Sequence, residues 1–330
     1  MGGGLFKLGR LPRVAYLVLE EELRQYLDKK FGNYYRIPRY YGDKPDFGDM
    51  DILLSSKAIQ TNWEDLKREI IQDLQIQEFK TQNRVLSTVY QNFQVDFFLR
   101  EHPYFESTYH FMSFNDIGNI IGKIFKRFNL RYGEKGLEYV FRRADNHYKK
   151  AFPLCQDFER IFTFLELDIE PWKLGFKTRK AMFDWVIKSP YFSIQPYQKL
   201  NASLRKRQRE RQTMQHFLTY LEEHQISKTY EYKENRDDYL PWIHQQFPEA
   251  NLLEKIEIER KREQYLKVIK EKYNGKIIMS LFPDLGGKAL GEFMQNFQNS
   301  LGDYEVVLFE LTSDEIEEQL KIFRQSTFRN

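Results

Sequence analysis

The chain has a single cysteine, Cys155, among its 330 residues. One thiol cannot form a disulfide within the chain, and it cannot supply the several thiolates of a cysteine-based zinc site. The six histidines do not compensate, because no two of them have the spacing of a helical zinc pair. We therefore expect neither a disulfide framework nor a zinc centre, and we interpret Cys155 as a packing residue.

The sequence also has no run of about 18 consecutive apolar residues, the length needed to cross a membrane. The opening segment, MGGGLFKLGRLPRVAYLVLEEEL, meets charged residues too early for a signal peptide. Gly2 follows Met1, but the serine or threonine of a myristoylation motif is missing. We therefore expect a soluble, intracellular protein with no membrane partner, and the sequence does not specify an oligomeric state.

Hydrophobic spacing in the first third of the chain alternates between the periods of helices and strands. Apolar residues recur at helical spacing over 12–31 and again over 62–75, where Asn62 is a suitable N-cap. Three short segments have the composition of strands: MDILLSS (50–56), RVLSTVYQ (84–91) and FQVDFFLRE (93–101). This order predicts a small mixed α/β unit.

From residue 114 onward the spacing becomes mainly helical. Helices are expected over residues 113–130, 157–168, 179–189, 200–224 and 251–273. The segment LGGKALGEF is interpreted as the start of a helix, and YEVVLF (304–309) as a strand. We therefore predict an α+β chain with a small mixed-sheet domain over residues 1–110, a mainly α-helical region over 111–270 and a small C-terminal α/β region over 271–330.

Two acidic residues, Asp49 and Asp51, stand at the start of the MDILL strand, directly after Gly48. Residues two apart in a strand project from the same face, so both carboxylates should reach one site. Like charges repel there unless a cation lies between them, and Mg²⁺ or Mn²⁺ prefers such oxygen ligands. Asp96, an isolated charge in the apolar strand FQVDFFL, is expected to supply a third ligand. Two such ions can hold a triphosphate for in-line attack by a hydroxyl.

GDMDILL resembles the signature of the DNA polymerase beta nucleotidyltransferase superfamily, in which a glycine-containing turn leads to an Asp-x-Asp strand and a later strand carries a third aspartate. VDFFL and the following HFMSFNDIGN are similar to the third-acid strand and the nucleotide-binding segment of family X DNA polymerases. The resemblance covers roughly residues 35–140. The segment NGKIIMSLFPDLGGKALGEF is weakly similar to the tail region of CCA-adding enzymes.

The resemblance implies a polymerase beta-like palm for the mixed-sheet domain and nucleotidyl transfer with Mg²⁺ or Mn²⁺. It makes Asp49, Asp51 and Asp96 the catalytic residues and the metal ligands, with Asp96 near the attacking 3′-hydroxyl. It also implies a nucleotide-binding set, in which a glycine lets the backbone approach the triphosphate, an aromatic pair lies beside the sugar and two polar residues contact the base: Gly48, His110, Phe111, Asp116 and Asn119.

The sequence departs from this family in the turn that binds the phosphates. The family has glycine followed by serine or glycine, whereas the register here falls on Pro38 and Arg39, and the nearest glycine is Gly42. One interpretation is that Arg39 and Lys44 supply cationic phosphate contacts in place of backbone amides. The others are that nucleotide affinity is lost, or that Lys44 belongs to a solvated turn. We assign Arg39, Gly42 and Lys44 to nucleotide binding as the working hypothesis.

Nucleic acid is the predicted acceptor, although the formal net charge is only +3, from 51 basic and 48 acidic residues. Two local clusters support this prediction: RKRQRER (205–211) on a long helix, and KIFKRFNLRYG (123–133), where basic and aromatic residues interleave. Each cluster also has a plainer interpretation, the first as a solvated helical face and the second as core aromatics. The candidate contacts are Lys123, Lys126, Arg127, Arg131, Arg205, Arg207 and Arg209.

Three functions remain compatible with the sequence. The leading hypothesis is a metal-dependent nucleotidyltransferase that moves a nucleoside monophosphate from an NTP or dNTP to the 3′ end of RNA or DNA and releases pyrophosphate. The second keeps this chemistry but uses a small molecule or a protein as the acceptor. The third is a catalytically degenerate fold that binds nucleic acid. The altered turn favours the third hypothesis, whereas three converging acids oppose it.

Overall fold

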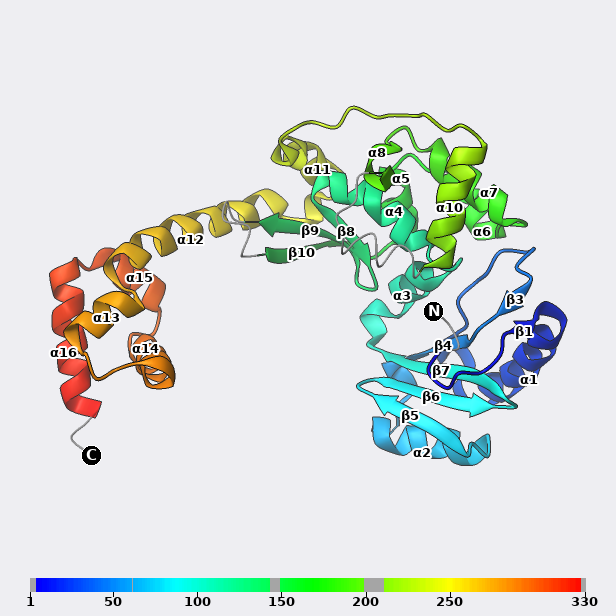
Figure 1. Cartoon of the computed structure of the whole chain (residues 1–330), viewed down its shortest axis with the longest axis horizontal. Coiled ribbons are helices and arrows are strands. Elements are labelled where there is room, and N and C mark those ends of the chain that lie inside the picture. The colour runs from blue at the N-terminus through cyan, green and yellow to red at the C-terminus, as the bar shows by residue number, and fades with distance from the viewer. Residues whose placement is uncertain (1–3, 61, 143–148, 199–210, 328–330) are drawn as a thin grey trace. The chain divides into compact units, whose positions relative to one another are not determined.

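The computed structural model describes residues 4–60, 62–142, 149–198 and 211–327 (Figure 1). The described residues form two compact units, one within residues 4–250 and the other over residues 251–327. The divisions after residues 110 and 270 remain predictions of functional domains. In the described part of the chain, no helix is long and apolar enough to cross a membrane.

A mixed five-stranded sheet lies at the start of the first unit, with the strand order β2-β4-β7-β6-β5. Its strands are β2 (Tyr35–Arg36), β4 (Met50–Ser55), β7 (Phe93–Arg100), β6 (Val85–Tyr90) and β5 (Glu78–Gln82). β4 and β7 run parallel, while the other neighbours are antiparallel. The three predicted strands are confirmed, and the α+β class is confirmed with the sheet preceding a mainly helical remainder.

Two helices, α1 (Arg13–Phe31) and α2 (Trp63–Asp73), share one hydrophobic core with the sheet. Alternate residues of the strands face these helices, and the following side chains are all buried: Leu23, Leu27, Leu66, Ile70, Ile52, Leu54, Phe97 and Leu99. α2 begins where the sequence predicts, because the side chain of Asn62 accepts a hydrogen bond from the amide of Asp65 at 3.0 Å. Since side chains alternate along a strand, the residues between the core positions belong to the opposite, open face of the sheet.

A second sheet, which the sequence analysis did not predict, lies in the region expected to be helical. It is antiparallel, with the order β10-β9-β8, and consists of β8 (Leu130–Gly133), β9 (Gly136–Arg142) and β10 (Lys149–Cys155). Gly133 and Gly136 pair at the end of the β8–β9 hairpin and enclose a two-residue turn. β9 contains the strand-favouring run Tyr139, Val140 and Phe141, which together with the two glycines favours a hairpin over a continuous helix.

Two helices, α3 (Phe105–Met112) and α4 (Ile117–Phe125), connect the two sheets. The helix predicted over 113–130 is shorter than expected at both ends. Phe114 and Asn115 precede it with φ angles of 59° and 61°, and Asn129 follows it with 57°. These left-handed conformations cannot continue a right-handed helix, which is why the apolar spacing overestimated its length.

The rest of the first unit is helical. Its helices are α5 (Phe158–Phe164), α6 (Glu170–Leu174), α7 (Arg179–Lys188), α8 (Gln195–Gln198), α10 (Gln212–Glu223) and α11 (Leu240–Gln246), and a short ribbon pairs β1 (Leu11–Pro12) with β3 (Asp46–Phe47). The helix predicted over 179–189 is confirmed, and the one predicted over 157–168 is present but ends at Phe164. Of the long helix predicted over 200–224, the part from Gln212 is confirmed, and residues 200–210 lie outside the described residues.

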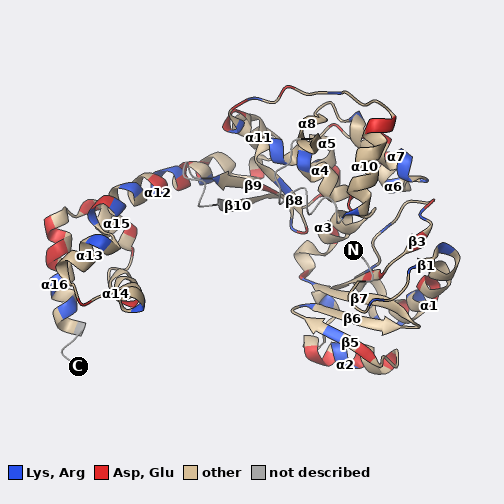
Figure 2. Ribbon diagram, in the orientation of Figure 1, with Lys and Arg blue, Asp and Glu red and all other residues tan. Residues whose placement is uncertain are grey.

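The second unit consists, in its described residues, of five helices: α12 (Leu252–Lys272), α13 (Gly275–Leu281), α14 (Gly287–Ser300), α15 (Tyr304–Glu310) and α16 (Ser313–Thr327). α12 confirms the predicted charged helix, and basic and acidic residues intersperse along it (Figure 2). α14 begins after Gly286, as expected for LGGKALGEF. The strand predicted for YEVVLF is wrong. Tyr304, Leu308 and Leu311 pack into the core at helical spacing, and this tertiary packing outweighs the strand propensity of the two valines.

Alanine at Gly136 should destabilise the β8–β9 hairpin. Gly136 has a φ of 85°, and a Cβ atom there would lie 2.3 Å from the carbonyl oxygen of Cys155. We expect Gly136→Ala to lower the free energy of unfolding by roughly 1–3 kcal/mol, measured by urea denaturation. Gly122 in α4 is the matched control, because a Cβ there meets nothing within 4 Å. Gly122→Ala should leave stability unchanged or raise it, and equal losses for both variants would contradict the prediction.

Candidate metal centre

Three aspartates meet on the open face of the sheet, where β4 and β7 run side by side. Asp49 precedes β4, Asp51 is its second residue, and Asp96 lies in the middle of β7. The parallel register places Asp51 opposite Asp96. One carboxylate oxygen from each of the three residues lies within 4.8 Å of the others. The structure thus brings together the three acids that the sequence analysis selected.

The acids lie in surroundings that disfavour their charged forms. Burial raises the pKa of Asp51 well above its usual value, and the neighbouring charges of Asp49 and Asp96 raise it further. Burial also raises the pKa of Asp96, although hydrogen bonds from Ser87 and Gln94 oppose the shift. The amide of Gln94 donates to Asp96 Oδ2 at 2.8 Å. The cluster is therefore a site of electrostatic repulsion that a bound cation would relieve.

The donor set fits a hard divalent cation such as Mg²⁺ or Mn²⁺. All three ligands are carboxylates, which these ions prefer. Asp96 Oδ1 is buried and has no hydrogen-bond partner, a costly arrangement unless a ligand completes it. Oxygen ligands of one Mg²⁺ lie roughly 3–4 Å apart, so the three carboxylate oxygens, which lie within 4.8 Å of one another, would draw closer to share one ion.

A cavity of about 1000 Å³ opens over the three acids. Gly48 lies in its wall beside Asp49, and the segment from Ile37 to Tyr40 forms another wall. Side chains from distant parts of the sequence complete the lining: Phe111, Asn115, Asp116, Asn119 and Arg211. The volume is sufficient for a nucleotide-sized ligand, whose phosphates would reach the acids.

Lys44 faces the acids across this cavity. Its side chain is half-buried, and its ammonium group lies 4.1 Å from the ring centre of Phe47 and 3.3 Å from Asn115 Oδ1. Burial lowers the pKa of Lys44 to about 8, although the charges of Asp49 and Asp51 oppose the shift. A half-buried ammonium over a ring is not part of a solvated turn, so the structure favours the interpretation of Lys44 as a cation of the site.

The other two residues of the altered turn have structural contacts. The Arg39 guanidinium donates to the carbonyl oxygens of Trp172 at 2.7 Å and Lys173 at 3.0 Å, although Arg39 also lies in the cavity wall. The amide of Gly42 donates to the Phe176 carbonyl at 2.8 Å. A Cβ atom at Gly42 would lie 2.6 Å from the carbonyl oxygen of Lys177. Both residues tie this turn to the 172–177 segment, and a nucleotide contact by either stays a prediction.

The aromatic pair predicted beside the sugar separates in the structure. Phe111 lines the cavity, whereas His110 lies outside its lining. The His110 ring stacks on Phe158 at a centroid distance of 3.6 Å, and its Nδ1 accepts a hydrogen bond from the Trp172 indole. Burial and the charge of Arg39 lower the pKa of His110 to about 4, so the ring is neutral near pH 7. His110 therefore packs the helix that carries Phe111.

Asp116 and Asn119 both line the cavity, as their predicted role requires. The Asn119 amide donates to Asp116 Oδ1 at 3.0 Å. Arg211, which the sequence analysis did not select, forms an ion pair with the same carboxylate at 3.0 Å. Arg211 is the last residue of the basic run RKRQRER, and nothing in the local sequence indicates that Arg211 lines this cavity.

The basic cluster at 123–133 is part of the packed structure. Lys123 donates to the Pro196 carbonyl at 3.2 Å, and burial lowers its pKa to about 8. Arg127 lies over the Tyr232 ring, and Arg131 pairs with Glu138 at 2.7 Å. The intervening aromatics are buried, which confirms their interpretation as core: Phe125, Phe128 and Tyr132. Nucleic-acid contacts of this cluster, including Lys126, stay a prediction, and Arg205, Arg207 and Arg209 lie outside the described residues.

Comparison with known proteins gives a distant structural similarity. Two ternary complexes of Leishmania infantum polymerase beta, a gap complex and a P/T complex, each match 42% of this chain with a TM-score of 0.33 and 15% sequence identity. The match spans 53% of one solved chain and 60% of the other. No protein-family model matches the chain. No curated protein matches it either.

Removing one charge from the acid cluster should stabilise the metal-free protein. Asp51→Asn deletes the carboxylate whose pKa the fold raises most clearly by burial and by its acidic neighbours. A carboxyl group with a raised folded-state pKa costs stability above its unfolded pKa, so the variant should melt a few degrees higher near pH 7 in EDTA.

Added Mg²⁺ should then raise the melting temperature of the wild-type protein more than that of Asp51→Asn. Glu223→Gln is the control, because it removes one exposed acid at the end of α10, far along the chain from the cluster. A lower melting temperature for Asp51→Asn in EDTA, or an equal response to Mg²⁺, would contradict the prediction.

Proposed function

We propose that this chain is a divalent-metal-dependent nucleotidyltransferase. It transfers a nucleoside monophosphate from an NTP or a dNTP to an acceptor hydroxyl, at the 3′ end of RNA or DNA, and releases pyrophosphate. The main support is the convergence of three carboxylates within 4.8 Å at a cavity of about 1000 Å³ that also contains a cation, Lys44. Carboxylates alone would repel a triphosphate, whereas carboxylates that hold divalent ions attract one.

In this proposal Asp49, Asp51 and Asp96 hold Mg²⁺ or Mn²⁺, which neutralises phosphate charge and lowers the pKa of the acceptor hydroxyl. The acceptor oxygen forms a bond to the α-phosphorus, the bond from this phosphorus to its bridging oxygen breaks, and pyrophosphate leaves with the electron pair. Asp96 takes the hydroxyl proton as the acid near the acceptor hydroxyl, and the Gln94 amide holds its carboxylate in place.

Lys44 and the polar residues of the cavity wall position the nucleotide. Lys44 binds the triphosphate in place of the backbone amides of the family's phosphate-binding turn. Phe111 packs against the sugar, and Asp116 and Asn119 contact the base from the same cavity. Arg211 holds Asp116 in place through their ion pair. Gly48 leaves room for the phosphates beside Asp49.

The first test is the activity of Asp96→Asn, which keeps the side-chain shape and removes the proton acceptor. We expect the transfer rate to fall by at least roughly a hundredfold, with an unchanged circular dichroism spectrum. Purified protein would be incubated with each labelled NTP and dNTP, Mg²⁺ or Mn²⁺, and short RNA and DNA acceptors. Asp65→Asn, on the exposed start of α2, should retain activity. Full activity of Asp96→Asn would defeat the proposal.

A second test concerns Lys44→Met, which keeps the length of the side chain but removes its charge. If Lys44 binds the triphosphate, the KM for the nucleotide should rise roughly tenfold or more, the cost of a lost charged hydrogen bond. The KM for the acceptor should remain unchanged. Lys29→Met, an exposed lysine near the end of α1, is the control. If the nucleotide KM of Lys44→Met is unchanged, Lys44 does not bind the triphosphate, and the phosphates bind elsewhere in the cavity.

A further inference from the structure

A second groove, of about 990 Å³, borders the metal centre on the open face of the sheet. Asp96 and Phe98 line both this groove and the nucleotide cavity. Its floor consists of residues of β5, β6 and β7, and its far wall comes from α3 and the β8–β9 turn. A molecule in this groove would therefore reach the third acid from the side away from Lys44, since Lys44 lines only the first cavity.

The strand register connects the acids to a lysine at the edge of the sheet. Asp51 pairs with Asp96 on β7, Asp96 pairs with Ser87 on β6, and Ser87 pairs with Lys80 on β5. Paired residues of adjacent strands have side chains on the same face, so these four form one row across the open face. With about 4.8 Å between neighbouring strands, Lys80 is about 10 Å from Asp96 along this row.

The groove combines cationic and aromatic side chains. Lys80, Arg84, Arg100 and Lys135 line it, and Phe98 and Tyr104 provide partly exposed rings. The Lys135 ammonium lies 5.4 Å from the Tyr104 ring centre, and the Arg100 guanidinium lies 5.2 Å from that of Phe98. Cations that follow a backbone beside rings that stack on bases are the features by which proteins bind single-stranded nucleic acid.

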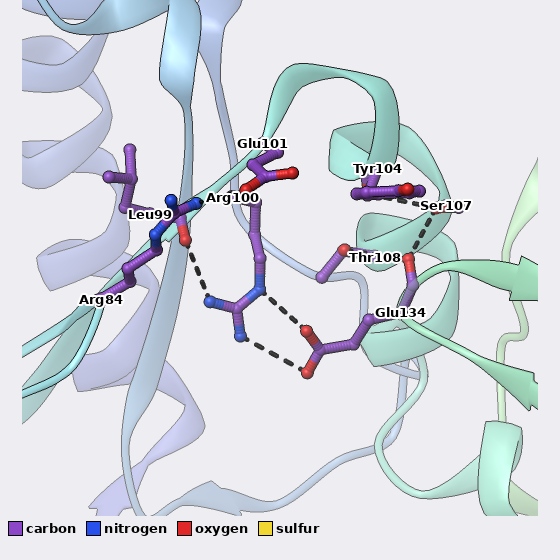
Figure 3. A network of polar contacts seen from close by, with 8 residues as sticks. All are labelled: Arg84, Leu99, Arg100, Glu101, Tyr104, Ser107, Thr108 and Glu134. Carbon is purple, nitrogen blue, oxygen red and sulfur yellow. Dashed lines mark hydrogen bonds and ion pairs between the residues drawn. The ribbon is translucent and has the colours of Figure 1, made fainter. Parts of the chain in front are cut away.

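The two other acids that line the groove, Glu101 and Glu134, are each paired with an arginine, so they do not prevent a polyanion from binding. Glu101 pairs with Arg84 at 3.0 Å, and both side chains are about half exposed, so a phosphate can replace this weak pair. Glu134 pairs with Arg100 at 2.9 Å, where Arg100 is largely buried. This second pair connects β7 to the β8–β9 turn (Figure 3). Setting aside Asp96, four cations therefore face two acids.

The far wall is fixed by hydrogen bonds to the same turn. The hydroxyl groups of Ser107 and Thr108, both on α3, donate to the backbone carbonyl of Glu134 at 2.6 and 3.2 Å (Figure 3). Together with the pair from Arg100, these bonds hold the turn that carries Lys135 over the groove. The wall is thus preorganised, which reduces the entropy cost of binding a flexible strand.

We propose that this groove binds the 3′ end of a single-stranded polynucleotide acceptor, with the terminal hydroxyl at Asp96. The inference rests on the proposed function, and it assigns the acceptor to a surface different from the two basic clusters that the sequence suggested. Lys80, Arg84 and Lys135 contact the phosphates that precede the terminal nucleotide, and Phe98 and Tyr104 stack on its bases.

The test compares full-length protein with Lys80→Glu/Lys135→Glu, a double variant at two exposed positions. Fluorescence anisotropy measures the Kd for a labelled single strand of about 12 nucleotides, of DNA or RNA, at several salt concentrations. We expect the Kd to rise roughly tenfold or more and the salt slope to fall by about 1.4, the loss of two phosphate contacts. The control Lys29→Glu/Arg68→Glu makes the same charge change at exposed positions of α1 and α2, and it should bind as wild type.

A second measurement locates the strand directly. An oligonucleotide with a photoreactive 3′-terminal base should crosslink to the β7, α3 or β8–β9 segments of the wild-type protein. This result does not depend on how well the variants fold or bind. Unchanged binding by Lys80→Glu/Lys135→Glu, or crosslinks confined to residues 123–131 or 205–211, would overturn the groove while leaving nucleotidyl transfer intact. Groove-dependent binding without any nucleotide transfer would overturn the acceptor assignment together with the proposed function.

Discussion

The parallel pairing of β4 with β7 is the constraint on which the site depends. This register places Asp51 beside Asp96, and Asp49 joins them from the residue before the strand. Such a cluster opposes folding, because burial and mutual repulsion raise the pKa of Asp51. The opposite face of the same strands holds the register, since Ile52, Leu54, Phe97 and Leu99 pack into the core with α1 and α2. Hydrophobic burial on one face thus maintains charge repulsion on the other.

Two cavities meet at this cluster, and later parts of the chain complete their walls. The first cavity, the proposed nucleotide site, depends on the turn before α4 and on Arg211, whereas the groove depends on α3 and the β8–β9 turn. Long-range contacts fix both walls: Arg39 bonds to the carbonyls of 172–173, and Arg100 pairs with Glu134. In the proposed function, these two cavities would give the nucleotide and the acceptor separate approaches to the three acids.

Apart from Arg211, the segments with the most basic residues in the sequence are not the segments whose cations line the two cavities, as far as the described residues show. In the described residues of the 123–133 cluster, Lys123, Arg127 and Arg131 contact a carbonyl, a ring and a carboxylate of the same unit. Cations outside the dense clusters line the cavities instead, namely Lys44 before β4 and Lys80 on the edge strand, although Lys44 also contacts Asn115 Oδ1 and Lys80 also donates to the Leu5 carbonyl at 3.2 Å. A side chain's availability depends on what packs against it, and that is a property of the tertiary structure.

By itself the sequence determined the elements whose pattern is local: the helices α1 and α2 with the Asn62 cap, the strands β4, β6 and β7, and the acids that point to one face. Periodicity sets these features because each depends on neighbours within a few residues. Only the tertiary structure decided that YEVVLF is a helix, that Phe114 and Asn115 shorten α4, and that Phe111 and His110 separate. Partners far apart in the chain impose these outcomes, and local propensity is too weak to resist them.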